Sequence, residues 1–138
     1  MKRILVSNGN PMETVVGFCR AVRVGPYISV GGTAPVDSKG KTVGIGDPAA
    51  QARRCLEIIK EALEKSGSGM EDVIRTRVIL TNIDDWKKVI DVRAEYFKSI
   101  RPVDTIMQVS CFINPEWLVE FEADAIVSDG SFPEIVGP

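Results

Sequence analysis

Three carboxylates occupy alternate positions near the end of the chain, at Glu120, Glu122 and Asp124. Side chains alternate between the two faces of a β-strand, so these three would line one face, about 6.6 Å apart in succession. If that face is partly buried, lost hydration and mutual repulsion raise the pKa of at least one carboxyl group. A carboxylate of this kind can serve as a general base or orient a water molecule. This segment is therefore a candidate for acid–base chemistry.

Two arginines of another expected strand would lie on the same face of the sheet as these carboxylates. Arg75 and Arg77 alternate with apolar residues, and their positive charges would oppose the rise in carboxyl pKa. A second interpretation of the same pattern is a sheet surface of mixed charge that is open to water. The spacing alone leaves both interpretations open.

The composition excludes several kinds of site. The chain has no histidine, which excludes His-ligated zinc, Ser-His-Asp and Cys-His nucleophiles, and imidazole acid–base catalysis. Cys19, Cys55 and Cys111 are far apart and odd in number, a pattern that favours free thiols in a reducing compartment over disulfides or a metal site. The net charge is −2 and the pI is about 5.2, which argues against a dedicated nucleic-acid binder.

The chain length of 138 residues suits one domain, which we expect over residues 1–127, followed by a loosely held tail at 128–138. The apolar start, residues 1–6, is too short for a signal-peptide core. No apolar run approaches the roughly 20 residues that span a bilayer. These features predict a cytoplasmic protein with no membrane contact.

The elements that must position the carboxylates can be read from the apolar pattern. Strands are expected at residues 18–24 and 27–30, joined as a hairpin, after a short opening strand; others are expected at 73–81, 105–112 and 118–127. On the strand at 73–81, Ile74, Thr76, Val78 and Leu80 would share the apolar face. Gly31 and Gly32 follow the hairpin directly, and paired glycines there indicate a bulge or a close approach of another group.

Two helices complete the pattern. The first is expected to begin at Asp47-Pro48, with Asp as the N-cap, and to end at Gly67. The second would begin near Asp84 or Asp85 and end at Arg101-Pro102, and its apolar face would carry Trp86, Val89, Ile90 and Phe97, with Arg93 near that stripe. Two helices cover only one face of such a sheet, so the order predicts an α+β domain with one sheet face left open.

Motifs along most of the chain resemble the Rid family, also called YjgF/UK114 or endoribonuclease L-PSP-like. Each motif is weak alone, but they occur in the family's order and spacing from about residue 17 to 127. They are FCRAVRVG at 18–25, VGGTA at 30–34, DVIRTRV at 72–78, TNIDDW at 81–86, Arg101-Pro102, and VEFEADA at 119–125.

The resemblance implies a chorismate-mutase-like (YjgF-like) α+β fold, with a mixed sheet, two helices on one face, and assembly as a homotrimeric barrel. It also implies small-molecule clefts between subunits, without metal or cofactor. Better-known members hydrolyse 2-imino or 2-enamino acids to 2-keto acids and ammonia. In them an arginine grips the substrate carboxylate and a glutamate positions water.

The family's site residues carry over onto this chain only in part. Glu120 matches the glutamate and is the expected catalytic residue. The family arginine falls on Asp104, the tyrosine on Phe18, the serine on Gly31 and a frequent cysteine on Ile106. These four positions are the expected ligand-binding lining, and none keeps the family's residue type.

The change from arginine to Asp104 alters the charge of the expected cleft by two units. A substrate carboxylate would be repelled there, so we expect a substrate that lacks a carboxylate or carries a cationic or polar group. Arg20 is a further candidate for ligand binding, as a replacement cation. Its other interpretation is an ordinary strand arginine paired with an acid.

Three functions remain open at this point. The first is a Rid-like protein in which Glu120 positions water to hydrolyse an imine or enamine. The second is a non-catalytic binding or regulatory module that uses the same cleft. The third, ribonuclease action, fits least well because an acidic chain has few cations to neutralise phosphates.

Overall fold

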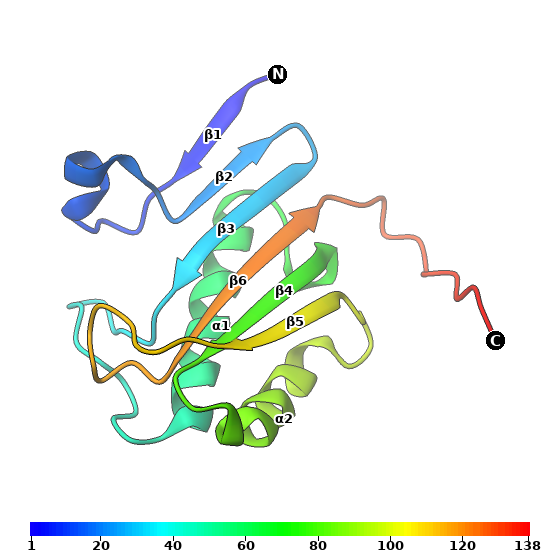
Figure 1. Cartoon of the computed structure of the whole chain (residues 1–138). Helices are drawn as coiled ribbons and strands as arrows, with labels where there is room; N and C mark the ends of the chain where they lie inside the picture. Colours follow the sequence, from blue (N-terminus) through cyan, green and yellow to red (C-terminus); the bar gives the residue numbers. More distant parts are fainter.

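The computed structural model describes residues 1–138 and contains one mixed six-stranded sheet. Strands and helices alternate along the chain as follows: β1 (Arg3–Val6), β2 (Ala21–Val24), β3 (Tyr27–Thr33), α1 (Pro48–Lys65), β4 (Val73–Leu80), α2 (Trp86–Phe97), β5 (Val103–Gln108) and β6 (Val119–Ile126). The sheet order is β1-β2-β3-β6-β4-β5, and only β4 and β5 run parallel. Figure 1 shows this order from the N-terminal edge to β5.

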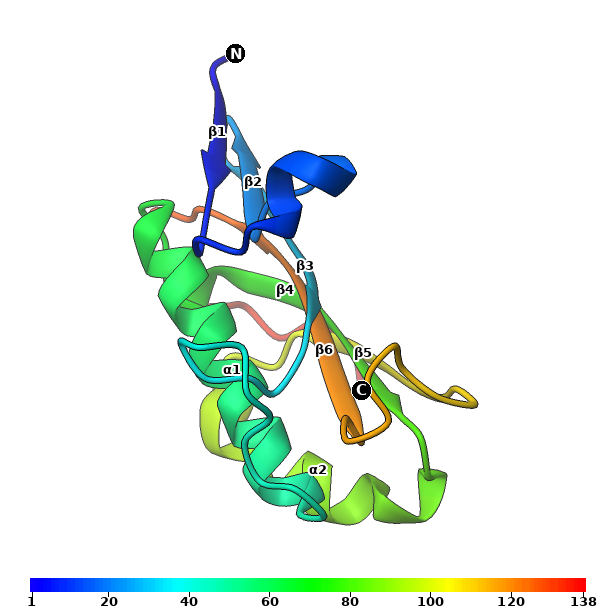
Figure 2. The same cartoon turned by 90° about the vertical axis from the view of Figure 1, so that its left-hand side faces the viewer.

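Both helices pack on one face of the sheet and leave the opposite face open, which confirms the expected α+β architecture (Figure 2). The apolar stripe of α1 lies against the central strand β6, whose alternate side chains Val119, Phe121, Ala123 and Ala125 are all fully buried. The alternation expected for this strand is therefore confirmed, and it directs the carboxylates to the open face.

Local signals placed α1 correctly. The carboxylate of Asp47 accepts a hydrogen bond from the backbone N–H of Ala50 at 3.1 Å, and Pro48 opens the helix. The helix ends at Lys65, and Gly67 follows with a φ of +83°, a conformation that glycine adopts without strain.

Helix α2 differs from its expected limits. It ends at Phe97 rather than at Arg101, and Arg101 itself has a φ of +59°. Arg101 precedes a proline, which disfavours the right-handed helical conformation there. On the expected apolar face of this helix Val89 and Phe97 are buried, whereas Trp86, at the first position of the helix, is 48% exposed.

Three strands also depart from expectation. β2 begins at Ala21 rather than at residue 18, and a short helical turn, Glu13–Gly17, precedes it. β5 is Val103–Gln108 rather than 105–112, since its parallel pairing with β4 runs from Arg75–Val103 to Leu80–Gln108. In β4, the register with β6 shifts between Val73 and Arg75, so Ile74 is an extra residue that turns out of the core and is 45% exposed.

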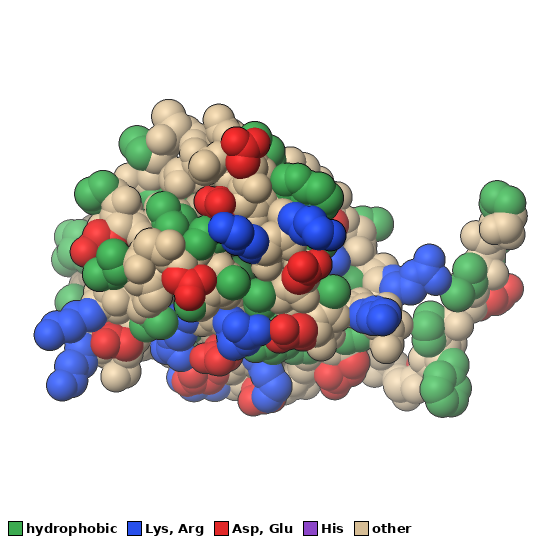
Figure 3. All heavy atoms as spheres, turned by 90° about the horizontal axis from the view of Figure 1, so that it is seen from below, with side chains coloured by type: hydrophobic (Ala, Val, Ile, Leu, Met, Phe, Trp, Pro, Cys, Tyr) green, Lys and Arg blue, Asp and Glu red, His purple; other side chains and the backbone are tan.

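The chain after Val127 forms no helix or strand and extends away from the domain, as Figures 1 and 3 show. The backbone N–H and hydroxyl of Ser128 both donate to Asp72, at 3.2 Å, and mark the last anchored residue before the exposed segment. No helix in the structure combines the length and apolar character needed to cross a membrane.

Candidate functional site

The open face of the sheet carries a polar network in which two of the three β6 carboxylates are engaged. Arg77 of β4 places Nη1 3.3 Å from Asp124 and 3.6 Å from Glu122. Asp124 also accepts hydrogen bonds from the hydroxyls of Tyr27 at 3.1 Å and Ser29 at 3.0 Å. Burial and the hydrogen bond to Asp124 raise the pKa of Tyr27. Asp124 is thus a structural link between strands β3, β6 and β4.

Glu120 is the carboxylate that this network leaves free. It is half-buried and has no cation within 4.0 Å. Burial raises its pKa, Arg20 lowers it, and the neighbouring charge of Glu122 raises it further. Of the three carboxylates, Glu120 therefore best fits the acid–base role expected from the sequence.

The paired glycines lie directly beside Glu120. The pairing of β3 with β6 is interrupted between Val30 and Thr33, so Gly31 and Gly32 form the expected bulge. A Cβ atom at Gly32 would lie 3.2 Å from Oε1 of Glu120, and one at Gly31 would lie 3.4 Å from Nη2 of Arg20. The absence of side chains at these two positions leaves the carboxylate and the guanidinium uncovered by β3.

Arg20 reaches this bulge from the segment before β2. Its Nη2 donates a hydrogen bond to the carbonyl of Gly32, while its Nε is buried without a partner. Burial lowers the pKa of this guanidinium, and the charge of Glu120 partly restores it. Arg20 forms no ion pair within 4.0 Å, and the acid whose charge acts on it most strongly is Glu120.

Phe18 lies near the same bulge. It is 43% exposed and lines a hollow of about 610 Å³ together with Ser29, Gly31 and Cys19. One chain therefore brings four expected site residues into one region: Phe18, Arg20, Gly31 and Glu120.

Asp104 and Ile106 lie elsewhere. Both are on β5, which is separated from β6 by β4, and both face the helices. Asp104 accepts a 2.7 Å hydrogen bond from the hydroxyl of the buried Thr76, and Ile106 packs against the core. Within one chain these two residues are not brought to Glu120.

A residue that sequence reasoning did not connect with the site compensates Asp104. Arg93 of α2 places Nε 3.5 Å from Asp104 and donates from it to Thr76 at 2.9 Å. Its guanidinium also lies over the ring of Phe97, 5.2 Å from the centroid. Asp104 is therefore one half of an ion pair rather than an isolated negative charge. The available signal was that Arg93 adjoins the apolar stripe of its helix.

The described residues contain no group of three or more His, Cys, Asp or Glu side chains that could hold a metal ion. The arrangement at the bulge instead offers a half-buried carboxylate, a guanidinium that forms no ion pair within 4.0 Å, and a stretch of backbone free of side chains. Such a set can hold a small polar molecule and a water next to a base.

Comparison with known proteins agrees with this architecture. The family model described as Endoribonuclease L-PSP matches residues 9–127. The crystal structure of a YjgF/YER057c/UK114 family member from Mycobacterium tuberculosis matches with a TM-score of 0.84 and 43% identity, covering 91% of this chain and 100% of that one. The chain belongs to the Rid family.

Two relatives of this Rid protein extend the comparison. An uncharacterized protein of Streptomyces coelicolor is 40% identical over 121 residues, which are 87% of this chain and 89% of the relative. The 3-aminoacrylate deaminase RutC of Acinetobacter baylyi is 32% identical over 126 residues, or 91% of this chain and 98% of the relative. Both matches span nearly the whole Rid domain.

Proposed function

We propose that this Rid protein hydrolyses the C=N bond of a small imine, or of the imine tautomer of an enamine, and releases ammonia. The observation that carries the proposal is Glu120, a half-buried carboxylate without an ion-pair partner beside the bare backbone of Gly31 and Gly32. A relative bearing the name 3-aminoacrylate deaminase supports deamination as the reaction class.

The chemistry needs one base that later acts as an acid. Glu120 accepts a proton from a water molecule as the water oxygen bonds to the carbon of the protonated imine, which gives a neutral carbinolamine. The carboxyl group then gives this proton to the nitrogen. The carboxylate takes the hydroxyl proton as the C–N bond breaks, so that a carbonyl compound and ammonia leave, and this last proton passes to the ammonia or to solvent. A carboxyl pKa raised by burial suits this exchange, because a more basic carboxylate accepts the proton from water more readily.

The complete site requires more than one chain in this proposal. Phe18, Arg20, Gly31 and Glu120 form one part, while Asp104 and Ile106 lie two strands away at the β5 edge. We propose that the chain forms a homotrimer in which the β5 edge of one subunit approaches the bulge of the next. The open sheet face, which no helix covers, supports such packing.

The β5 part of the cleft influences which substrates bind. Arg93 balances the charge of Asp104, so this part offers neither a free cation for a carboxylate nor a free anion for an ammonium group. We therefore propose a substrate whose group facing Asp104 is uncharged and donates a hydrogen bond, such as an amide or a hydroxyl.

The proposal is tested by measuring ammonia release from imines generated in the cuvette. A flavin amine oxidase converts an amine with no other charged group into an imine without a carboxylate. An amino acid oxidase acting on alanine supplies 2-iminopropanoate. The expected result is acceleration over the protein-free rate for the first imine and little for the second. Rapid hydrolysis of 2-iminopropanoate would refute the charge argument at Asp104.

A non-catalytic binding module is the alternative outcome of the same experiment. A protein that binds these molecules without accelerating ammonia release from either of them would contradict the hydrolase and favour the binding module.

A further inference from the structure

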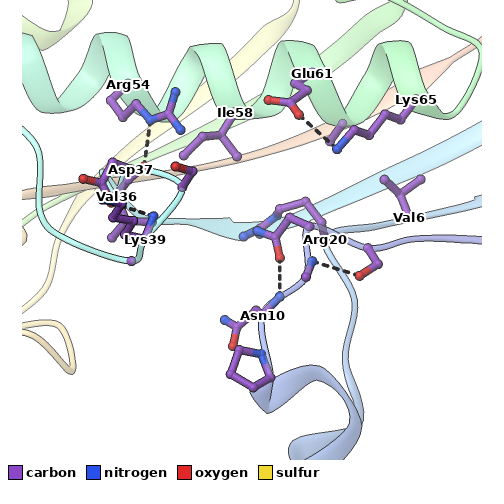
Figure 4. A pocket seen from close by; sticks show the side chains of 17 residues that line it. Val6, Asn10, Arg20, Val36, Asp37, Lys39, Arg54, Ile58, Glu61 and Lys65 are labelled. Atoms are coloured by element: carbon purple, nitrogen blue, oxygen red, sulfur yellow. Dashed lines mark hydrogen bonds and ion pairs between the residues drawn. The ribbon is translucent and has the colours of Figure 1, made fainter.

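A second pocket lies on the helix side of the domain, away from the open sheet face. It occupies about 370 Å³ between α1, the loop at residues 7–11 and the loop at residues 36–40. Figure 4 shows α1 along one side, with the N-terminal loop facing it across the pocket. This volume lies within the range of small-molecule sites.

The pocket concentrates positive charge in a protein that is acidic overall. Four cations line it, Arg20, Lys39, Arg54 and Lys65, against two carboxylates, Asp37 and Glu61. The whole chain, in contrast, carries a net charge of −2. The excess of two positive charges favours an anionic occupant.

Both carboxylates of the pocket are already engaged. Glu61 lies 2.9 Å from Lys65 on the same helix. Asp37 accepts hydrogen bonds from the backbone N–H groups of Lys39 and Lys41, at 2.8 and 2.9 Å, which hold its loop and lower its pKa. Neither carboxylate forms an ion pair within 4.0 Å with Arg20 or Lys39.

Two of the four cations are left without an acidic partner. Arg54 contacts Glu57 at 3.5 Å and donates to the carbonyl of Val36, whereas Lys39 and Arg20 have no carboxylate within 4.0 Å. Arg20 also has a buried Nε without any hydrogen-bond partner. Lys39 and Arg20 are therefore the two cations lining the pocket that have no carboxylate partner.

The rest of the pocket is suited to an organic anion rather than to a bare ion. Val6, Ile58 and Ala62 supply an apolar wall, and Ile58 projects from α1 toward Arg20 in Figure 4. We propose that this pocket is a second binding site, separate from the Glu120 site, for a small organic carboxylate or phosphate monoester whose anionic group lies between Arg20 and Lys39.

The shared residue links this site to the proposed function. The guanidinium of Arg20 faces the pocket and also stabilises the charge of Glu120. An anion bound to Arg20 would offset that positive charge at Glu120. An effect of this offset on the rate of hydrolysis rests on the proposed function. Binding itself does not depend on that function.

The test is a titration of the isotope-labelled full chain with phenyl phosphate and with inorganic phosphate, followed by amide NMR at constant ionic strength. We expect saturable shifts at residues 7–11, 36–40 and the second half of α1, with tighter binding of phenyl phosphate. Lys39→Gln should weaken binding about tenfold, as expected for one charge-assisted hydrogen bond, and Arg20→Gln by at least as much.

Lys41→Gln is the matched control, because Lys41 is in the same loop, is exposed and does not line the pocket. Its affinity should equal that of the unmodified protein. Equal weakening by Lys39→Gln and Lys41→Gln would show non-specific surface attraction and overturn the proposal. Shifts that do not saturate, or that avoid the pocket, would overturn it too. None of these outcomes depends on ammonia release, so failure here is distinguishable from failure of the proposed function.

Discussion

At the scale of single residues, the three carboxylates of β6 differ because their neighbours differ. Asp124 has Arg77, Tyr27 and Ser29 as partners, whereas Glu120 has only the more distant field of Arg20. The same strand thus holds a structural carboxylate and, in the proposed function, a reactive one, four residues apart. Environment, not residue type, separates the two roles.

The raised pKa of Glu120 has a consequence for stability. A carboxyl group whose pKa is higher in the folded than in the unfolded chain favours folding below its unfolded pKa, and this contribution is lost as pH rises through the folded pKa. Glu120→Gln removes the cost of holding the charge. We expect its melting temperature to exceed that of the unmodified protein at pH 7 and the gap to close toward pH 4, measured by thermal unfolding.

Glu122→Gln is the control for that comparison, because Glu122 contacts Arg77 at 3.6 Å and its charge is partly balanced. It should bring no comparable gain at pH 7. A melting temperature of Glu120→Gln at or below that of the unmodified protein at pH 7 would contradict the account of Glu120 as a carboxylate held at a cost.

At the scale of elements, the Arg93–Asp104 pair joins α2 to β5. The two side chains are 14% and 20% exposed, and Thr76 of β4 bonds to both. Arg93→Met leaves the carboxylate and the hydroxyl without their cation. We expect it to lower the free energy of unfolding by about 1–3 kcal/mol in urea titrations.

Asp104→Asn is the milder change at this position, since an amide oxygen can still accept from Thr76. The double variant should lose less stability than the sum of the two single variants, because the residues interact. Strict additivity would mean that the pair contributes nothing to the joint between α2 and β5.

The same elements show what a sequence can and cannot reveal. The start of α1 was predictable because Asp47 and Pro48 act locally, within one turn. The displacement of Ile74 was not, because it depends on the register between β4 and β6. The partner of Asp104 was missed for a similar reason, since Arg93 reaches it from another element. Local chemistry is readable along the chain, whereas contacts between elements require the fold.

At the scale of the whole molecule, one chain keeps the two parts of the proposed site apart and leaves one sheet face uncovered by α1 and α2. Tyr27, Val103 and Ile126 are among its exposed large side chains, at 43%, 60% and 42%. Packing of subunits would remove apolar surface from water and bring the β5 edge to the bulge. The proposed trimer therefore explains both features with one arrangement.

The assembly is measured directly by sedimentation equilibrium. We expect a single species with three times the mass of one chain over a wide range of concentration. A monomer that nevertheless hydrolyses imines would show that Asp104 and Ile106 take no part in the site.

The central claim is that the carboxylate of Glu120 performs the hydrolysis. Its most direct test compares initial rates of ammonia release from the imine without a carboxylate for Glu120→Gln and Glu122→Gln, two variants with the same change of charge on the same strand. The account predicts a loss of about 100-fold or more for Glu120→Gln and a rate near that of the unmodified protein for Glu122→Gln. Equal rates for the two variants would contradict it.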